Sequence, residues 1–131
     1  MSKKVLVVDD ANVTRMLIIL PIKQAGYETV EAVNPDDALL KLKENKVDMI
    51  ITDLHMPHMD GLDFIRLLRA MPKYEDTPII MVTTESQTAK VQEGRAAGAN
   101  GWIVKPIKPT QVLDIVQKFI GGGATPVVSE E

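Results

Sequence analysis

Four short runs of mostly β-branched residues stand out along the chain. They cover residues 5–8, 49–52, 79–83 and 102–104. None of these runs alternates apolar with polar side chains, and continuous apolarity over so short a length is typical of strands covered on both faces, as in a parallel sheet. A weaker run at 28–32 does alternate and is typical of an edge strand. The pattern predicts five strands in one sheet.

Helical spacing fills the first gap between these runs. We expect a helix that has Asn12 as its N-cap, ends at Gly26 and is kinked by Pro21. Its apolar stripe at helical spacing consists of Val13, Met16, Leu17 and Leu20.

Four further helices are predicted by caps and apolar spacing. They begin at or near Asn34–Asp36, Leu62, Ser86 and Pro109–Thr110. The helix that begins at Ser86 is expected to end near Gly98, and its apolar residues are mostly alanines plus Val91. Because such a stripe buries little surface, we expect this helix to be weakly anchored and able to shift.

Strand and helix thus alternate five times along a chain of 131 residues. Right-handed crossovers between parallel strands place helices on both faces of the sheet, so the fold class is α/β, a doubly wound parallel sheet flanked by five helices. Residues 1–120 form one domain of ordinary size. The glycine-rich, then acidic stretch 121–131 is expected to be a flexible tail.

Composition excludes several classes of function. Cysteine is absent, which excludes a disulfide scaffold, a thiol nucleophile and a thiolate metal site. The net charge of −3 disfavours binding to the phosphates of a nucleic acid, because proteins that bind them are normally basic. The apolar stretches fall far short of the roughly 20 residues of a membrane span, and residues 1–4 carry no signal-peptide pattern. We therefore expect a cytoplasmic protein that binds neither nucleic acid nor membranes.

The functional crevice of a doubly wound sheet lies at the carboxyl ends of its strands. Three carboxylates, a hydroxyl and an ammonium group stand at these ends, carried by Asp9, Asp10, Asp53, Thr83 and Lys105. Each of these residues has an ordinary structural interpretation when taken alone. Asp9 and Asp10 could form a turn or a helix cap, Asp53 could be a structural aspartate, Thr83 a strand residue and Lys105 a solvated surface lysine. Their joint placement at successive strand ends favours a site.

Three neighbouring carboxylates repel one another and need a compensating cation. Oxygen ligands with room for water suit Mg²⁺, whereas zinc is disfavoured because cysteine is absent and the histidines lack a metal-binding spacing. Asp53 stands centrally and is the best-placed nucleophile for accepting a phosphoryl group as an acyl phosphate. Lys105 is placed to pair with the phosphoryl oxygens, and Thr83 to donate a hydrogen bond to them.

These residues lie in four motifs that resemble the receiver domain of two-component response regulators, most closely its single-domain, CheY-like chemotaxis members. The motifs are Val7–Asp10, Thr52–Gly61, Met81–Ser86 and Gly98–Pro106. The similarity covers roughly residues 3–120. It implies a flavodoxin-like fold with strand order 2-1-3-4-5.

The resemblance also implies roles for individual residues at the acidic cluster. Asp53 corresponds to the phosphoacceptor. Asp10 and Asp53 correspond to side chains that bind Mg²⁺ directly, Asp9 to one that acts through water, and the backbone carbonyl of His55 to the third protein ligand. His55, Thr84 and Glu85 occupy positions that tune access of water and the lifetime of the phosphoryl group.

Other roles follow from the resemblance for the remaining motifs. Thr83 and Lys105 correspond to the pair that contacts the phosphoryl group, and the peptide bond before Pro106 corresponds to a cis bond. Thr83 and Trp102 correspond to the switch pair, with tryptophan in place of the usual tyrosine or phenylalanine.

The implied function is that of a phosphoacceptor signalling protein rather than a conventional enzyme. A histidine kinase donates a phosphoryl group to Asp53, and the chain catalyses its own phosphorylation and dephosphorylation. The face built from the fourth helix, fifth strand and fifth helix then controls a partner, with the flagellar motor switch as the candidate. A phosphatase is a candidate second partner, and a monomer is expected.

Three alternatives remain open. A receiver outside motility, acting as a phosphoryl sink, shuttle or adaptor, would share every site residue. A phosphatase of the haloacid dehalogenase type would need an acid where His55 stands and its nucleophile at the end of the first strand. A flavodoxin-like cofactor protein would need a phosphate-binding loop rich in serine, threonine and glycine where Asp9 and Asp10 stand.

Overall fold

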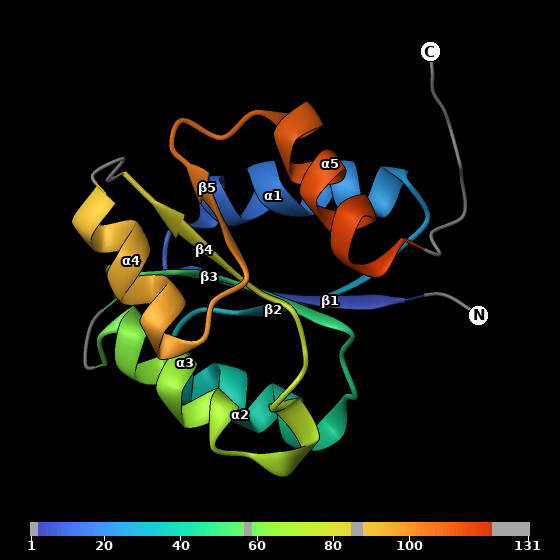
Figure 1. The fold of residues 1–131 in the computed structure, drawn as a ribbon. Coiled ribbons are helices and arrows are strands. Elements are labelled where there is room, and N and C mark those ends of the chain that lie inside the picture. The colour runs from blue at the N-terminus through green and yellow to red at the C-terminus, as the bar shows by residue number, and fades with distance from the viewer. Residues whose placement is uncertain (1–2, 57–58, 85–87, 122–131) are drawn as a thin grey trace.

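A parallel sheet of five strands forms the centre of the molecule (Figure 1), seen in a computed structural model that describes residues 3–56, 59–84 and 88–121. The strands are β1 (Lys4–Val8), β2 (Glu28–Ala32), β3 (Met49–Asp53), β4 (Ile79–Thr83) and β5 (Gly101–Val104). Their order is β2-β1-β3-β4-β5, and every neighbouring pair is parallel. The predicted fold class and strand order are confirmed.

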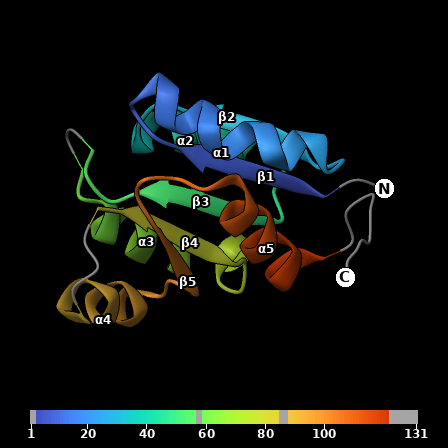
Figure 2. The ribbon, with the colours of Figure 1, turned by 90° about the horizontal axis from the view of Figure 1, so that it is seen from above.

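Helices cover both faces of this sheet (Figures 1 and 2). They are α1 (Asn12–Gln24), α2 (Pro35–Glu44), α3 (Gly61–Arg69), the 3-10 turn η1 (Pro72–Tyr74), α4 (Thr88–Ala97) and α5 (Pro109–Ile120). Helices α1 and α5 pack together on one face, while α2, α3 and α4 lie on the other. Each face encloses its own hydrophobic cluster, because all residues of β3 and β4 are buried and alternate between the two sides.

The strand register brings the predicted site residues to one edge. Val8 of β1 pairs with Thr52 of β3, so the residues that follow this pair, Asp9 and Asp53, lie side by side. Further along the sheet Asp53 pairs with Val82, and Thr83 pairs with Val104. Residues far apart in the sequence therefore meet where β1, β3, β4 and β5 end.

Helix α1 differs from the prediction in two ways. Its N-cap is Ala11 rather than Asn12, although Pro21 lies inside the helix and Gly26 follows its C-terminal end, as predicted. The apolar stripe predicted from spacing does not face the core, because its members Val13, Met16, Leu17 and Leu20 are 43–72% exposed. The buried face carries Arg15, Ile18, Ile19, Pro21 and Ile22 instead. Both sets show helical spacing, but the buried set begins with an arginine, so apolarity alone does not identify it.

Helix α4 has the thin contact with the sheet that its composition predicts. Within residues 89–97 only Gly94 and Ala97 are buried, and both lie in the second half of the helix. A Cβ atom at Gly94 would overlap the side chain of Met81, so the missing side chain is what allows the helix to approach β4 closely. The predicted start at Ser86 lies outside the described residues, as do Glu85 and the predicted tail beyond Gly121.

Candidate functional site

Three carboxylates gather at the carboxyl ends of β1 and β3. One oxygen atom each from Asp9, Asp10 and Asp53 lies within 4.8 Å of the others. Asp9 and Asp53 are buried, with 1% and 3% of their surface exposed, while Asp10 faces solvent. The predicted acidic cluster is therefore present, with Asp9 and Asp53 buried and Asp10 exposed to solvent.

The backbone and side chain of Asp9 are held in a defined orientation. Its N–H donates to the carbonyl of Ala32 over 3.1 Å, and its Oδ1 accepts from the N–H of Ala11 over 2.8 Å. Its Oδ2 is buried and has no hydrogen-bond partner among the described residues. An unpaired buried carboxylate oxygen carries a desolvation penalty of about 1–3 kcal/mol, which a cation at this position would relieve.

Burial raises the pKa of the Asp9 carboxyl above its ordinary value. The hydrogen bond from Ala11 and the charge of Lys105 act in the opposite direction, while the charges of Asp53 and Asp10 raise the pKa further. The net direction is upward because desolvation is the largest of these effects. Asp9 thus carries its negative charge at a free-energy cost that a divalent cation would offset.

Asp53 ends β3 and lies between two groups that could stabilise its charge. The Nζ of Lys105 lies 3.4 Å from its Oδ2, and the N–H of His55 donates to its Oδ1 over 3.3 Å. The side chains of Asp53 and Lys105 are 4% and 24% exposed, so the pair is largely shielded from water. The ammonium group is thus held directly beside the Asp53 carboxylate.

Lys105 and Thr83 are joined through the backbone at the ends of β5 and β4. The N–H of Lys105 donates to the carbonyl of Thr83 over 2.9 Å, and the Lys105–Pro106 peptide bond is cis, as expected. Thr83 is buried, with 1% of its surface exposed. The sheet thus brings a hydroxyl and an ammonium group to the same edge as the carboxylates.

Comparison with known proteins agrees with this geometry. Residues 5–117 match the family model of the response regulator receiver domain. The chain belongs to this family. It is a receiver of the kind found in two-component response regulators.

Several relatives of this receiver are similar over nearly their whole length. A chemotaxis protein CheY homolog of Campylobacter jejuni is 41% identical over 123 residues, which are 92% of this chain and 95% of that protein. CheY of Thermotoga maritima is 40% identical over 90% of this chain and 98% of its own. The solved structure of CheY4 of Vibrio cholerae has a TM-score of 0.87 at 40% identity and covers 92% of this chain and 100% of that one.

A further solved structure bears on the acidic cluster. The receiver domain of the sensor histidine kinase PA1611 from Pseudomonas aeruginosa has a TM-score of 0.83 at 25% identity, and it covers 93% of this chain and 100% of its own. That structure contains a magnesium ion coordinated in its active site cleft.

Trp102 of this receiver lies half-buried on β5, on the side of the sheet covered by α4. The guanidinium group of Arg95, from α4, lies 5.1 Å from the centre of its ring, within the range of a cation–π interaction. A cleft of about 310 Å³ beside this pair includes residues of α4, β5 and α5. The indole therefore lies at the face formed by α4, β5 and α5, which is the face predicted to change on phosphorylation.

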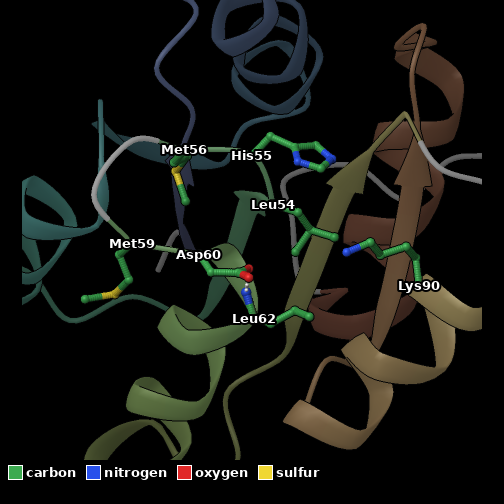
Figure 3. Close-up of a pocket in the computed structure, with 7 residues that line it drawn as sticks. All are labelled: Leu54, His55, Met56, Met59, Asp60, Leu62 and Lys90. Atoms are coloured by element: carbon green, nitrogen blue, oxygen red, sulfur yellow. Dashed lines mark hydrogen bonds between the residues drawn. The ribbon is translucent and has the colours of Figure 1, made fainter.

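A second groove, of about 410 Å³, lies between the β3–α3 loop and α4 (Figure 3). Its lining consists of Leu54, His55, Met56, Met59, Asp60, Leu62 and Lys90. Figure 3 shows the Lys90 side chain extending from α4 toward Leu54, while the Asp60 carboxylate caps α3 by accepting from the Leu62 N–H over 2.9 Å. His55 and Thr84 are both exposed, which is compatible with their predicted influence on water access.

Sequence reasoning missed Arg15 and Arg95. Arg15 lies on the buried face of α1, at the helical spacing that it shares with Ile18, Ile19 and Ile22, and its side chain donates to the backbone carbonyl of Asp9. That spacing is visible in the sequence and would have identified Arg15 as a buried charge. No sequence signal would have paired Arg95 with Trp102, because their contact depends on how α4 sits over β5.

In the described part of the receiver no helix combines the length and the apolarity needed to cross a membrane.

Proposed function

We propose that this receiver regulates chemotaxis by accepting a phosphoryl group on Asp53 from a histidine kinase and then controlling a partner protein, with the flagellar motor switch as the candidate. The observation that supports it best is the Lys105 ammonium group 3.4 Å from the buried Asp53 carboxylate, inside a cluster of three acids. The named relatives are chemotaxis proteins, which favours this role over that of a phosphoryl shuttle in another pathway.

The acidic cluster fits a divalent cation, and Mg²⁺ is the one we propose. Asp10 and Asp53 would hold it directly, Asp9 through water, and the backbone carbonyl of His55 would be a further ligand. Supporting observations are the unpartnered Oδ2 of Asp9 and the set of hard oxygen donors. Bound there, Mg²⁺ supplies charge neutralisation for the phosphoryl group during transfer.

Phosphoryl transfer uses the Asp53 carboxylate as the nucleophile. A carboxylate oxygen of Asp53 attacks the phosphorus of a phosphohistidine, an O–P bond forms, the N–P bond breaks, and the imidazole nitrogen keeps the electron pair. Lys105 then exchanges its contact with Oδ2 for the phosphoryl oxygens, and the Thr83 hydroxyl donates to them. Attack of water on the phosphorus reverses the change, releasing inorganic phosphate and regenerating the carboxylate.

The output step is a change of the α4–β5–α5 face. Phosphorylation adds charge and acceptor oxygens beside Thr83, which moves toward them. Trp102 turns into the space that Thr83 leaves, and this movement requires it to leave Arg95. A partner that binds the new arrangement more tightly shifts the population toward it, and only such a difference in affinity can do so.

Other properties stay predictions. The receiver is expected to act as a monomer in the cytoplasm, with residues 1–120 as its domain and 121–131 as a tail. A phosphatase that shortens the lifetime of the acyl phosphate would approach through His55, Thr84 and Glu85.

Fluorescence of Trp102, the only tryptophan, tests the proposal. Acetyl phosphate should change the emission in the presence of Mg²⁺ and leave it unchanged with a chelator. Asp53→Asn should abolish the response, whereas Asp63→Asn, at an exposed position of α3, should retain it. A Mg²⁺-dependent response that survives in Asp53→Asn would refute the role of Asp53.

A further inference from the structure

Arg15 is a charged residue in an unusual place. It lies in the first half of α1 with only 8% of its surface exposed, on the side of the helix that packs against the sheet. Arginine is rarely buried unless its guanidinium group is fully paired. The hydrogen-bond partners of the Arg15 guanidinium group therefore indicate the role of this buried charge.

All three nitrogen atoms of the guanidinium group donate hydrogen bonds. Nη1 donates to the backbone carbonyl of Asp9 over 2.7 Å, Nε to Oε1 of Glu31 over 2.9 Å, and Nη2 to Oδ1 of Asn12. The first of these bonds is buried. Arg15 thus connects α1 and β2 to the segment that carries the acids after β1.

The bond to the Asp9 carbonyl has consequences for two side chains. That carbonyl belongs to the peptide unit between Asp9 and Asp10, and a peptide unit is planar. Fixing its oxygen limits the rotation that sets where the Asp9 side chain points on one side and the Asp10 side chain on the other. The N–H of Asp9 is held as well, by the carbonyl of Ala32.

Strand β2 holds this segment both directly and through Arg15. Ala32, which accepts from Asp9, directly follows Glu31, which accepts from Arg15. The Asp9–Asp10 segment is therefore held between β2 and the guanidinium group, while the buried Oδ2 of Asp9 has no hydrogen-bond partner among the described residues.

We propose that Arg15 is a positioning residue for the cation site: by holding the Asp9 carbonyl it fixes the directions in which the Asp9 and Asp10 carboxylates point. The inference rests on the proposed function, since it concerns the same acidic cluster. It extends that function to a residue that would touch neither the cation nor the phosphoryl group.

A purely structural role makes a different prediction. If Arg15 only joined α1 to β2, its loss would lower the free energy of unfolding and leave the Mg²⁺ affinity of the folded protein unchanged. If it positions the acids, the affinity falls in protein that remains folded. Mg²⁺ affinity measured on folded protein separates the two roles.

The experiment is calorimetric titration with MgCl₂ at a temperature where circular dichroism shows each variant to be folded. We expect Arg15→Met to weaken Mg²⁺ binding about tenfold, the scale at which residues behind metal ligands act. Arg15→Lys should fall between Arg15→Met and the unchanged protein, because an ammonium group reaches one partner but lacks the fork of donors. Arg66→Met removes an exposed arginine paired with Asp63 on α3 and should bind Mg²⁺ normally.

Glu31→Gln separates the two contacts of Arg15. It weakens the ion pair but leaves the Nη1 bond to Asp9, so we expect Mg²⁺ affinity within about threefold of the unchanged protein, a loss well below the tenfold scale for residues behind metal ligands. Folded Arg15→Met that binds Mg²⁺ normally would overturn the inference. If that variant does not fold, Arg15→Lys decides, and normal affinity in it overturns the inference too. Failure of the unchanged receiver to bind Mg²⁺ would instead refute the proposed function.

Discussion

The Nζ atom of Lys105 and the Oδ2 atom of Asp53 lie 3.4 Å apart, although 52 positions separate the two residues in the chain. The parallel sheet causes this proximity, because β3 and β5 end at the same edge with only β4 between them. The same sheet edge carries the hydroxyl of Thr83 and the two acids after β1. The chemistry of the site is therefore a direct consequence of strand order.

Replacing Lys105 should separate cation binding from signal output. In Lys105→Ala, the three acids keep their positions and we expect Mg²⁺ affinity within about threefold, since loss of a partly exposed cation changes binding modestly. The fluorescence change of Trp102 with acetyl phosphate should be lost, because the phosphoryl oxygens lack their ammonium partner. Lys43→Ala, at an exposed position of α2, is the control. Equal loss of Mg²⁺ binding and output in Lys105→Ala would contradict this division of roles.

Asp9 should make the cation-free protein less stable at neutral pH. Its pKa is raised in the folded state, mainly by burial, so the folded protein binds the proton more tightly than the unfolded chain does. The contribution of Asp9 to folding therefore becomes unfavourable as pH rises from the unfolded value of 3.8 through the raised value, and it stays unfavourable above it.

Asp9→Asn tests this sign, because its side-chain oxygen can still accept from Ala11. With a chelator at neutral pH, urea unfolding should show a gain of about 1–2 kcal/mol, a gain that shrinks as pH falls. The variant should also gain less stability from added Mg²⁺ than the unchanged receiver does. A loss of stability in Asp9→Asn at neutral pH without Mg²⁺ would show that the carboxylate is already satisfied.

Gly61 is required by the close approach of α3 to the end of β3. A Cβ atom there would lie 2.5 Å from the Cα of Leu54 and 2.8 Å from the carbonyl oxygen of Asp53, both backbone atoms. We expect Gly61→Ala to lower the free energy of unfolding by about 1–3 kcal/mol and to slow phosphorylation, because the backbone of Asp53 must move. Gly101→Ala is the matched control, since its Cβ would meet side chains at 3.4 Å or more. Equal effects of the two substitutions would refute this explanation.

Arg95 should restrain Trp102 at the surface. Removing a cation–π contact worth about 0.5–1 kcal/mol would raise the population of the inward ring by about two- to fivefold. Arg95→Gln should therefore shift the Trp102 emission toward that of the phosphorylated receiver before any phosphodonor is added. Lys73→Gln, which removes a cation lying 5.6 Å from the ring of Tyr74, should leave the emission unchanged. An unshifted spectrum in Arg95→Gln would show that the contact does not restrain the ring.

The sequence was most informative where one physical rule dominates. Continuous apolar runs predict buried strands, and strand ends in a parallel sheet predict where polar side chains meet, so the sequence alone brings Asp9, Asp53 and Lys105 together. Helix α1 was harder, since Met16 and Ile19 are equally apolar and belong to different stripes. Tertiary packing buries the stripe that begins with Arg15, because its guanidinium group finds one acceptor on β2 and another at Asp9, the residue after β1.

A Mg²⁺-dependent acyl phosphate at Asp53 is the central feature of the proposed function, and mapping that bond tests it most directly. Borohydride reduces an aspartyl phosphate to homoserine, which peptide mass spectrometry locates to a single position. After treatment with acetyl phosphate and Mg²⁺, we predict homoserine at position 53 and none when a chelator replaces Mg²⁺. Reduction at another aspartate, or equal labelling of Asp53 without the cation, would contradict the account.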